Sequence, residues 1–354
     1  MRISTPGRIC LFGEHQDYLG LPVVAAAISR RIGIESKARN DQKIVIDQPD
    51  IGHTETFELS ETWPYNKKRD YFRSTINVLK KRGFVFSQGI ECRVSGNIPI
   101  NSGTSSSSAL VVTWVHTLIK WCDNPREVSA KEMGEIANEA EVLEFGEPGG
   151  MMDHYSTACG NVIYLESIPQ IKVETLQPQL GAFVLGDSQQ PKDTLGILSR
   201  CRYGMEAILA KVTAFDAHFS IFDTPAQQAN DYRKLLTEDE FGLFSANLAD
   251  RDILRAGKKL LQNGAMDDQQ FGQLLYQHFE NLRDYKRTST PKINRMMEAA
   301  LQAGALGGKI NGSGGGGCMF VYAPTHAHAA AEAIESVGGK AYIIQIDAGT
   351  RVDS

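Results

Sequence analysis

The chain has 354 residues, which is longer than one domain usually is, so two domains that share an interface are expected. Apolar residues make up 42% and charged residues 22% of the chain, as in an ordinary globular protein, and this composition excludes a disordered chain. The formal net charge of −5 argues against a nucleic-acid partner, which would require a basic face.

Cysteine use and the apolar runs bear on the compartment. The six cysteines are scattered without a CxxC pair, which is typical of free thiols and not of a disulfide framework or a zinc site. Pro6, Gly7 and Arg8 precede any apolar run, so no secretory signal fits the N-terminus. The best apolar stretch, residues 23–28, is far too short to cross a bilayer. We therefore expect a cytoplasmic protein with no membrane partner.

The first half of the chain begins with β-like runs, and helical patterns follow. The β-like runs predict strands at residues 8–15, 22–29, 43–48, 91–100 and 161–166. Apolar residues at helical spacing predict helices at residues 70–82, 109–121 and 130–145. A strand, a loop of small residues and a helix thus succeed one another between residues 91 and 121.

The second half is richer in helical patterns. Residues 168–180 contain Pro and Gln and are predicted to cross between two domains, 1–170 and 171–354. The elements predicted beyond this crossing are helices at 196–218, 249–262, 268–285, 293–303 and 326–336, and strands at 318–324 and 341–347. The mixture indicates an α+β fold and not a regular βαβ series.

The first segment with candidate chemistry is residues 6–18, which contain an arginine, a histidine and two carboxylates beside an apolar strand. Glu14 and Asp17 would accept hydrogen bonds from a polyol, and hydrogen bonds to charged groups are the stronger kind. A surface turn with incidental charges is the alternative.

The second segment, residues 99–109, is a loop of small residues that includes four consecutive serines. Its backbone N–H groups can approach phosphate oxygens closely, and the helix that follows directs its N-terminal dipole at the same anion. It is not a Walker A loop because the GK[ST] ending is absent. The alternative is a flexible Ser-rich linker.

Two further segments complete the set. Residues 307–318 are rich in glycine and enter a strand near the C-terminus, so a dinucleotide-binding loop, which precedes a helix, does not fit. A hinge or a linker is the alternative there. Residues 141–154 end a helix and form a Pro-Gly-Gly turn that presents Asp153, a carboxylate suited to act as a catalytic base.

In this order, the four segments resemble the motifs of the GHMP kinase family, and of its galactokinases most closely. The first motif of the family reads PGRxNxIGEHxDYxGG, and this chain has PGRICLFGEHQDYLGL, with departures at Cys10 and Leu21. In the segment 99–109 the departures from the family motif are Asn101, Ser102 and Thr104. In the segment 307–318 they are Asn311 and Ser313, and in the segment 141–154 they are Glu144, Phe145, Gly149 and His154. The resemblance implies an N-terminal domain like the second domain of ribosomal protein S5, a ferredoxin-like C-terminal domain, and a site between them.

The resemblance also implies residue roles. Asp153 would accept the proton of the acceptor hydroxyl, and Arg8 would hold that hydroxyl and the γ-phosphate of ATP. The other implied site residues are, for the sugar, Glu14, His15, Asp17, Gly150 and Gly315; for ATP, Gly103, Ser105, Ser106, Ser107 and Ser108; and for Mg²⁺, Glu141 with Ser107 or Ser106. An arginine beside Asp153 would keep the carboxylate ionised, and charge stabilisation with positioning is most of what phosphoryl transfer needs.

Several residues carry secondary hypotheses. His154 is expected to have a structural hydrogen-bonding role, and Asp187 with Ser188 to form a polar turn that faces the cleft. Trp63, Tyr65 and Tyr71 are candidates to stack on adenine, with simple packing as the alternative. Ile197 lies near the position where galactokinases have a tyrosine that touches the sugar, so the sugar need not be galactose.

Three functions remain open on these residues. The first is an ATP- and Mg²⁺-dependent kinase for the C1 hydroxyl of galactose or a relative such as a uronic acid, an arabinose or an N-acetyl sugar. The second is a mevalonate-type kinase, against which Asp17-Tyr18 and Met152-Asp153 count. The third is a non-catalytic sugar and ATP sensor, which the retained Arg8, Glu141 and Asp153 disfavour. We expect a monomer or a weak homodimer.

Overall fold

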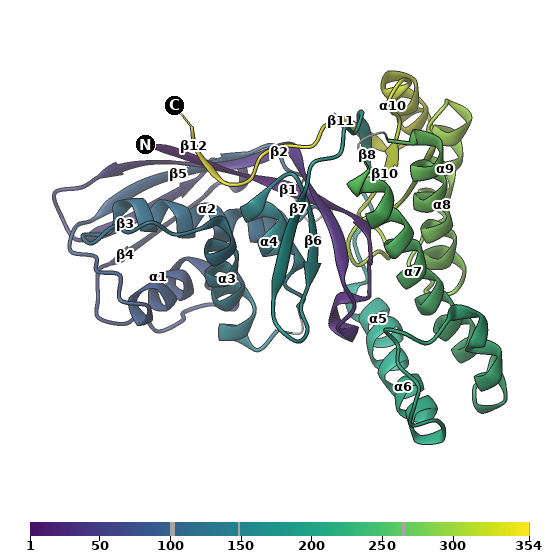
Figure 1. Cartoon of the computed structure of the whole chain (residues 1–354). Helices are drawn as coiled ribbons and strands as arrows, with labels where there is room; N and C mark the ends of the chain where they lie inside the picture. The colour runs from purple at the N-terminus through teal and green to yellow at the C-terminus, as the bar shows by residue number, and fades with distance from the viewer. Residues whose placement is uncertain (100–102, 148, 264–265, 354) are drawn as a thin grey trace.

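The computed structural model describes residues 1–99, 103–147, 149–263 and 266–353. Two sheets and their covering helices make up most of this part of the chain, so the α+β prediction is confirmed (Figure 1). The motif departures at Asn101 and Ser102 lie outside the described residues.

The larger sheet belongs mainly to the first half of the chain. Its strands are β1 (Arg2–Phe12), β2 (Val23–Ala38), β3 (Lys43–Gln48), β4 (His53–Glu58), β5 (Ile90–Gly96), β6 (Val162–Glu166), β7 (Lys172–Leu176) and β12 (Arg351–Asp353). The main order is β12-β1-β2-β5-β3-β4, and β6 joins β2 to β7. Only the β3–β5 pair is parallel among the described strands. Because β12 pairs with β1, the two ends of the chain lie side by side (Figure 1).

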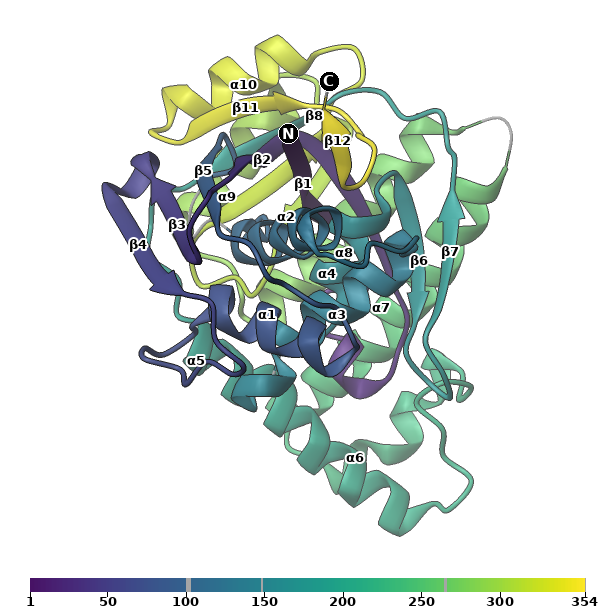
Figure 2. The same cartoon turned by 90° about the vertical axis from the view of Figure 1, so that its left-hand side faces the viewer.

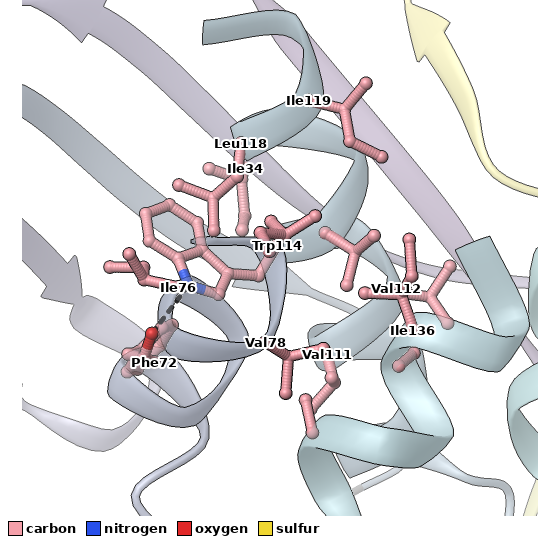
Figure 3. Close-up of a cluster of buried hydrophobic side chains, with 14 of the residues drawn as sticks. Ile34, Phe72, Ile76, Val78, Val111, Val112, Trp114, Leu118, Ile119 and Ile136 are labelled. Carbon is pink, nitrogen blue, oxygen red and sulfur yellow. Dashed lines mark hydrogen bonds between the residues drawn. The ribbon is translucent and has the colours of Figure 1, made fainter. Parts of the chain in front are cut away.

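Four helices cover one face of this sheet, and Figure 2 looks onto three of them. They are α1 (Tyr71–Lys81), α2 (Ser106–Trp121), α3 (Ala130–Glu141) and α4 (Met152–Cys159). Helix α2 is apolar on nearly all sides, as expected of a helix buried between a sheet and other helices. Its Trp114 fills the core beside Phe72 and Ile76, and the indole N–H donates to the Phe72 carbonyl at 3.1 Å (Figure 3).

Strands β1 and β2 are covered on both faces, which explains their continuous apolar runs. On one face, Cys10 and Ala25 pack with Tyr155 of α4. On the other, Ile9 and Val24 join a core that includes side chains of the second half. Side chains from both halves of the chain therefore pack together in the core on this second face of β1 and β2.

The second half builds a four-stranded antiparallel sheet in the order β11-β8-β10-β9. Its strands are β8 (Phe183–Asp187), β9 (Gly307–Ile310), β10 (Cys318–Tyr322) and β11 (Lys340–Ile344), and its helices are α8 (Asp268–Asp284), α9 (Pro291–Gln302) and α10 (Ala327–Ser336). After β8 the chain forms α5 (Thr194–Leu198) and a π-helical turn (Ser199–Tyr203). A separate apolar cluster then joins α6 (Gly204–Phe215), a 3₁₀ segment (Ala226–Leu235) and α7 (Glu238–Gln262). Across the described residues, no helix is long and apolar enough to cross a membrane.

Several elements differ from their predicted form. The strand predicted at 8–15 begins at Arg2 and ends at Phe12, the strand predicted at 22–29 extends to Ala38, and the helix predicted at 196–218 is divided into α5, the π-helical turn and α6. The predicted helix at 249–262 begins earlier, at Glu238, because Thr237 and Glu240 form a reciprocal capping box. Residues 307–310 of the glycine-rich segment are strand β9, so its loop is limited to residues 311–317, named the Gly-rich loop below. The predicted crossing at 168–180 contains β7, which pairs with β6 in the first sheet. The domain boundary after residue 170 stays a prediction.

Candidate active site

A pocket of ≈ 360 Å³ lies where the two halves meet. The first half lines it with Arg8 on β1, the 13–18 turn, Arg69 and Tyr71, residues 103–108 (named the serine loop), Glu141 and Val142, and residues 147–154 except for position 148. The second half contributes Lys192, Leu198, Gly312 and Ser313. The segments singled out in the sequence, which are far apart in the chain, therefore surround one cavity.

Arg8 and Asp153 form an ion pair on the pocket wall although 145 positions separate them. The Arg8 Nε donates to Asp153 Oδ1 at 2.8 Å, and Nη2 lies 2.6 Å from the same oxygen. The third guanidinium nitrogen, Nη1, donates to the carbonyl of Gly103 in the serine loop. The Arg8 side chain is only 4% exposed whereas that of Asp153 is 32% exposed. The arginine is therefore locked in the wall, and the carboxylate remains open to the pocket.

The protonation state of Asp153 follows from its neighbours. Burial by itself would raise the pKa of this carboxyl, but the Arg8 guanidinium, with His154 and the Ser105 hydroxyl, holds it below its ordinary value. The residue also lies in the first turn of α4, where the helix dipole favours a negative charge. Asp153 is therefore ionised at neutral pH and able to accept a proton.

The serine loop turns directly into the N-terminus of α2. Ser105 has a left-handed backbone (φ 60°), and the helix starts at Ser106. Ser107 is exposed in the pocket, whereas Ser108 is buried. Gly103 has φ 93°, and a Cβ there would lie 2.5 Å from the Asn311 carbonyl, so only glycine fits between the serine loop and the Gly-rich loop. The arrangement is that of an anion-binding helix N-terminus.

Glu141 lies beside the serine loop and is held by His154. Its Oε2 lies 2.7 Å from His154 Nε2, and His154 Nδ1 lies 3.3 Å from Asn138 Nδ2. The expected structural hydrogen-bonding role of His154 is confirmed. A carboxylate from Glu141 and a hydroxyl from Ser107 in one pocket fit Mg²⁺, which takes few protein oxygens when phosphates and water supply the others. Within the described ranges no group of three or more His, Cys, Asp or Glu is arranged to hold a metal ion.

Glu14 is buried and already satisfied by the second half of the chain. Its Oε1 accepts from the Gly312 N–H at 2.7 Å, and its Oε2 accepts from Lys309 Nζ at 2.5 Å. A buried carboxylate needs such partners. Glu14 thus joins the 13–18 turn to the Gly-rich loop, although it also lines the pocket.

His15 is neutral and its hydrogen bonds fix its tautomer. Burial, with the nearby Lys286 ammonium, lowers the pKa of His15 to about 3. Its Nε2 lies 3.0 Å from the Ser313 carbonyl, which only accepts, so Nε2 carries the proton. Its Nδ1 then accepts the hydroxyl proton of Tyr18 at 3.0 Å. The pocket side of the Tyr18 oxygen is consequently an acceptor.

Asp17 faces Asp153 across the pocket. Burial and the charge of Asp153 raise the pKa of Asp17 to about 6. A Cβ on Gly150 would lie 1.7 Å from Asp17 Oδ2, so glycine at this position is what leaves room for the carboxylate. The position of the Asp17 carboxylate therefore depends on the absence of a side chain at Gly150.

The structure does not bring every implied residue to the pocket. Gly315 lies behind the wall, where its N–H donates to the Thr288 carbonyl at 2.7 Å, and Gly312 and Ser313 line the cavity instead. Ser188 is buried and donates to the Gly317 carbonyl at 2.6 Å, so it supports the Gly-rich loop and does not face the cleft.

Of the three candidate aromatics, Tyr71 lines the pocket. Trp63 is buried in the core and donates to the Glu58 carbonyl at 2.8 Å, and Tyr65 packs on Phe145. Three pocket residues, Arg69, Lys192 and Leu198, lie outside the four segments that the sequence singles out. None lies in a glycine- or serine-rich run, so no local pattern distinguishes them.

Three family models match the chain. They are the GHMP kinases N terminal domain over residues 70–161, the GHMP kinases C terminal over residues 247–340, and the galactokinase galactose-binding signature over residues 1–35. Together the three models cover more than half of the chain. The chain belongs to the GHMP kinase family.

Individual relatives divide between two activities. A mevalonate kinase of Pyrococcus furiosus is 26% identical over 354 residues, with 97% of this chain and 95% of that protein covered. A galactokinase of Mannheimia succiniciproducens is 28% identical over 339 residues, with 92% of this chain and 85% of that protein covered. The crystal structure of Lactococcus lactis galactokinase complexed with galactose superposes with a TM-score of 0.81 over 99% of this chain and 94% of that chain, at 23% identity. The predicted GHMP kinase fold is confirmed, and the family makes the chain a kinase.

Proposed function

We propose that this GHMP kinase transfers the γ-phosphoryl group of ATP to the anomeric C1 hydroxyl of galactose or a closely related monosaccharide. The observation that carries the proposal is the Arg8–Asp153 pair. It presents an ionised carboxylate to a pocket that the N-terminus of α2 also lines.

In this proposal Asp153 accepts the proton of the acceptor hydroxyl through its exposed carboxylate. The hydroxyl oxygen then forms a bond to the γ-phosphorus as the bond from that phosphorus to the bridging oxygen of ADP breaks. The products are the sugar phosphate, ADP and one proton. Arg8 and the N–H groups at the start of α2 stabilise the charge on the phosphoryl oxygens, which is the main requirement of this reaction.

Glu141 and Ser107 would hold Mg²⁺, which supplies positive charge to the phosphates when it is bound. His154 positions the Glu141 carboxylate through the 2.7 Å contact. The residue that follows the catalytic aspartate in the chain would thus orient the metal ligand.

The sugar end of the pocket is the part next to Asp17, His15 and Tyr18. The Asp17 carboxylate and the Tyr18 oxygen are hydrogen-bond acceptors that suit the hydroxyls of a sugar. The galactose-binding signature covers these residues, which supports a sugar over other alcohols. Glu14 would affect sugar binding indirectly, by fixing the position of the 13–18 turn, since its carboxylate already has protein partners.

Mevalonate is the second candidate acceptor. The mevalonate kinase of Pyrococcus furiosus covers 97% of this chain at an identity similar to that of the galactokinase, so similarity alone does not choose between them. The pocket carries Asp17 and Tyr18 at the acceptor end, and the proposal favours a sugar for that reason.

A coupled assay of ADP release tests the proposal. We expect turnover with galactose, a uronic acid, an arabinose or an N-acetyl sugar, with Mg²⁺ required, and phosphorus NMR of the product would show phosphate on C1. Turnover with mevalonate alone would overturn the sugar assignment. Sugar binding without ADP release from any acceptor would overturn catalysis and leave a sensor.

A further inference from the structure

Lys192 is a pocket residue that comes from outside the four motif segments. It lies between β8 and α5, in the second half of the chain, and reaches the serine loop of the first half. A Cβ on Gly103 would lie 3.1 Å from Lys192 Nζ, so the ammonium group lies directly against the loop backbone. The contact places Lys192 at the end of the pocket where the serine loop would hold phosphate.

Two cationic side chains, Arg8 and Lys192, lie near Gly103, and Arg8 is paired with a carboxylate. Arg8 donates to the Gly103 carbonyl, and the Lys192 ammonium lies close to the same residue. Since the Arg8 charge is already paired with Asp153, those two side chains together contribute little net charge. Lys192 therefore adds a positive charge that the Arg8–Asp153 pair does not offset.

Two fully buried lysines, Lys286 and Lys309, have carboxylate partners, and the half-buried Lys192 differs from them. Lys286 lies 2.8 Å from Asp250, and Lys309 pairs with Glu14. For Lys192, the described residues supply no ion pair or hydrogen bond. Burial, together with Arg8, lowers the pKa of the Lys192 ammonium below its ordinary value, as expected of a partly buried cation close to another cation. An anion bound beside it would relieve this cost.

We propose that Lys192 is a catalytic residue that binds an oxygen of the γ-phosphoryl group of ATP and stays with that group during its transfer. The inference rests on the proposed function. No proton moves at Lys192: its ammonium hydrogen-bonds the same phosphoryl oxygen while the bond to ADP breaks and the bond to the acceptor oxygen forms. Charge-assisted hydrogen bonds of this kind are strengthened as negative charge shifts in the transition state.

The first test separates the γ-phosphate from the rest of the nucleotide. In Lys192→Met we expect the Kd of ATP to rise by about tenfold with the Kd of ADP nearly unchanged, since one charge-assisted hydrogen bond is lost and only ATP has the γ-phosphate. A merely structural role would weaken both nucleotides equally. Lys211→Met is the matched control, because Lys211 pairs with Glu240 on the surface of α6 and lies outside the pocket.

The second test measures turnover. We expect kcat to fall by about a hundredfold in Lys192→Met, with partial recovery in Lys192→Arg and none of this loss in Lys211→Met. Equal loss of ATP and ADP binding, or a kcat within twofold of the unmodified protein, would overturn the inference. If only turnover of an acidic sugar is lost, Lys192 binds the acceptor carboxylate and the inference is also wrong.

The two proposals fail in different ways. An unmodified protein that turns over no acceptor contradicts the proposed function, yet the comparison of ATP with ADP still decides whether Lys192 contacts the γ-phosphate. An unmodified protein that turns over a sugar, with an unaffected Lys192→Met variant, contradicts the inference alone.

Discussion

Asp153→Asn is the substitution that most directly tests the catalytic assignment. Asparagine keeps the shape of the side chain and still accepts a hydrogen bond from Arg8, but it has neither the charge nor the basicity of the carboxylate. Positioned general bases contribute about 10²- to 10⁴-fold to rate, so we expect kcat to fall by at least about a hundredfold. Binding of the sugar should survive, because Asp17, His15 and Tyr18 form the acceptor end.

The cost of Asp153→Asn to stability should be small by comparison. Arg8 loses an ionic partner, but Asp153 is 32% exposed and the hydrogen bond from Arg8 Nε remains possible. We expect about 1.5–3 kcal/mol less free energy of unfolding, which is the scale of one charge-assisted hydrogen bond. Asp347→Asn is the matched control, since Asp347 pairs with Arg31 at 2.9 Å at a comparable exposure of 21% and lies outside the pocket.

The assay is ADP release at saturating ATP with varied sugar, combined with calorimetric binding of the sugar and urea unfolding of each variant. A folded Asp153→Asn protein with kcat within about twofold of the unmodified enzyme would refute the reasoning. The same refutation would follow if Asp347→Asn lost as much activity, because the loss would then reflect general destabilisation.

Three further predictions concern other parts of the pocket. In Gly150→Ala the new Cβ would lie 1.7 Å from Asp17 Oδ2 and would displace the carboxylate. The KM for the sugar should therefore rise at least about tenfold, with a smaller change in kcat. An unchanged KM in initial-rate measurements would contradict the assigned pairing of Asp17 with Gly150. In Glu141→Gln the Mg²⁺ concentration for half-maximal rate should rise by at least about tenfold in a metal titration, and an unaltered titration would remove Glu141 from the metal site. The pKa of Asp17 is raised from 3.8 to about 6 in the folded protein, so the folded state binds its proton more tightly than the unfolded state does, and stability should fall as pH rises from about 4 to about 6. Asp17→Asn should remove this fall in urea unfolding between pH 4 and pH 7, and an identical pH dependence in both proteins would contradict the shift.

The family and most of the helices and strands could be predicted from the amino-acid sequence, whereas β4, β7, β8 and β12 were not among the predicted elements. Apolar periodicity predicted both ends of α1 to within one residue and the end of α2, which starts three residues before its predicted start, and the apolar run at 23–28 lies within β2. These patterns can be recognised because a helix with one buried face, or a buried strand, has apolar residues at a characteristic spacing in the local sequence. The serine-rich segment could also be recognised, because close approach of backbone to phosphate requires small residues in consecutive positions.

The tertiary structure alone decided which side chains meet. Nothing local to Arg8 indicates its ion pair with a residue 145 positions away, and nothing local to Lys192 indicates contact with the serine loop. Glu14 has the sequence context of a ligand-binding carboxylate, yet Lys309 and Gly312 occupy its oxygens. Such contacts depend on how two halves of the chain pack on the two faces of β1 and β2. Packing between residues that are far apart in the chain produces no characteristic periodicity or composition in any short stretch of sequence, so it could not be predicted.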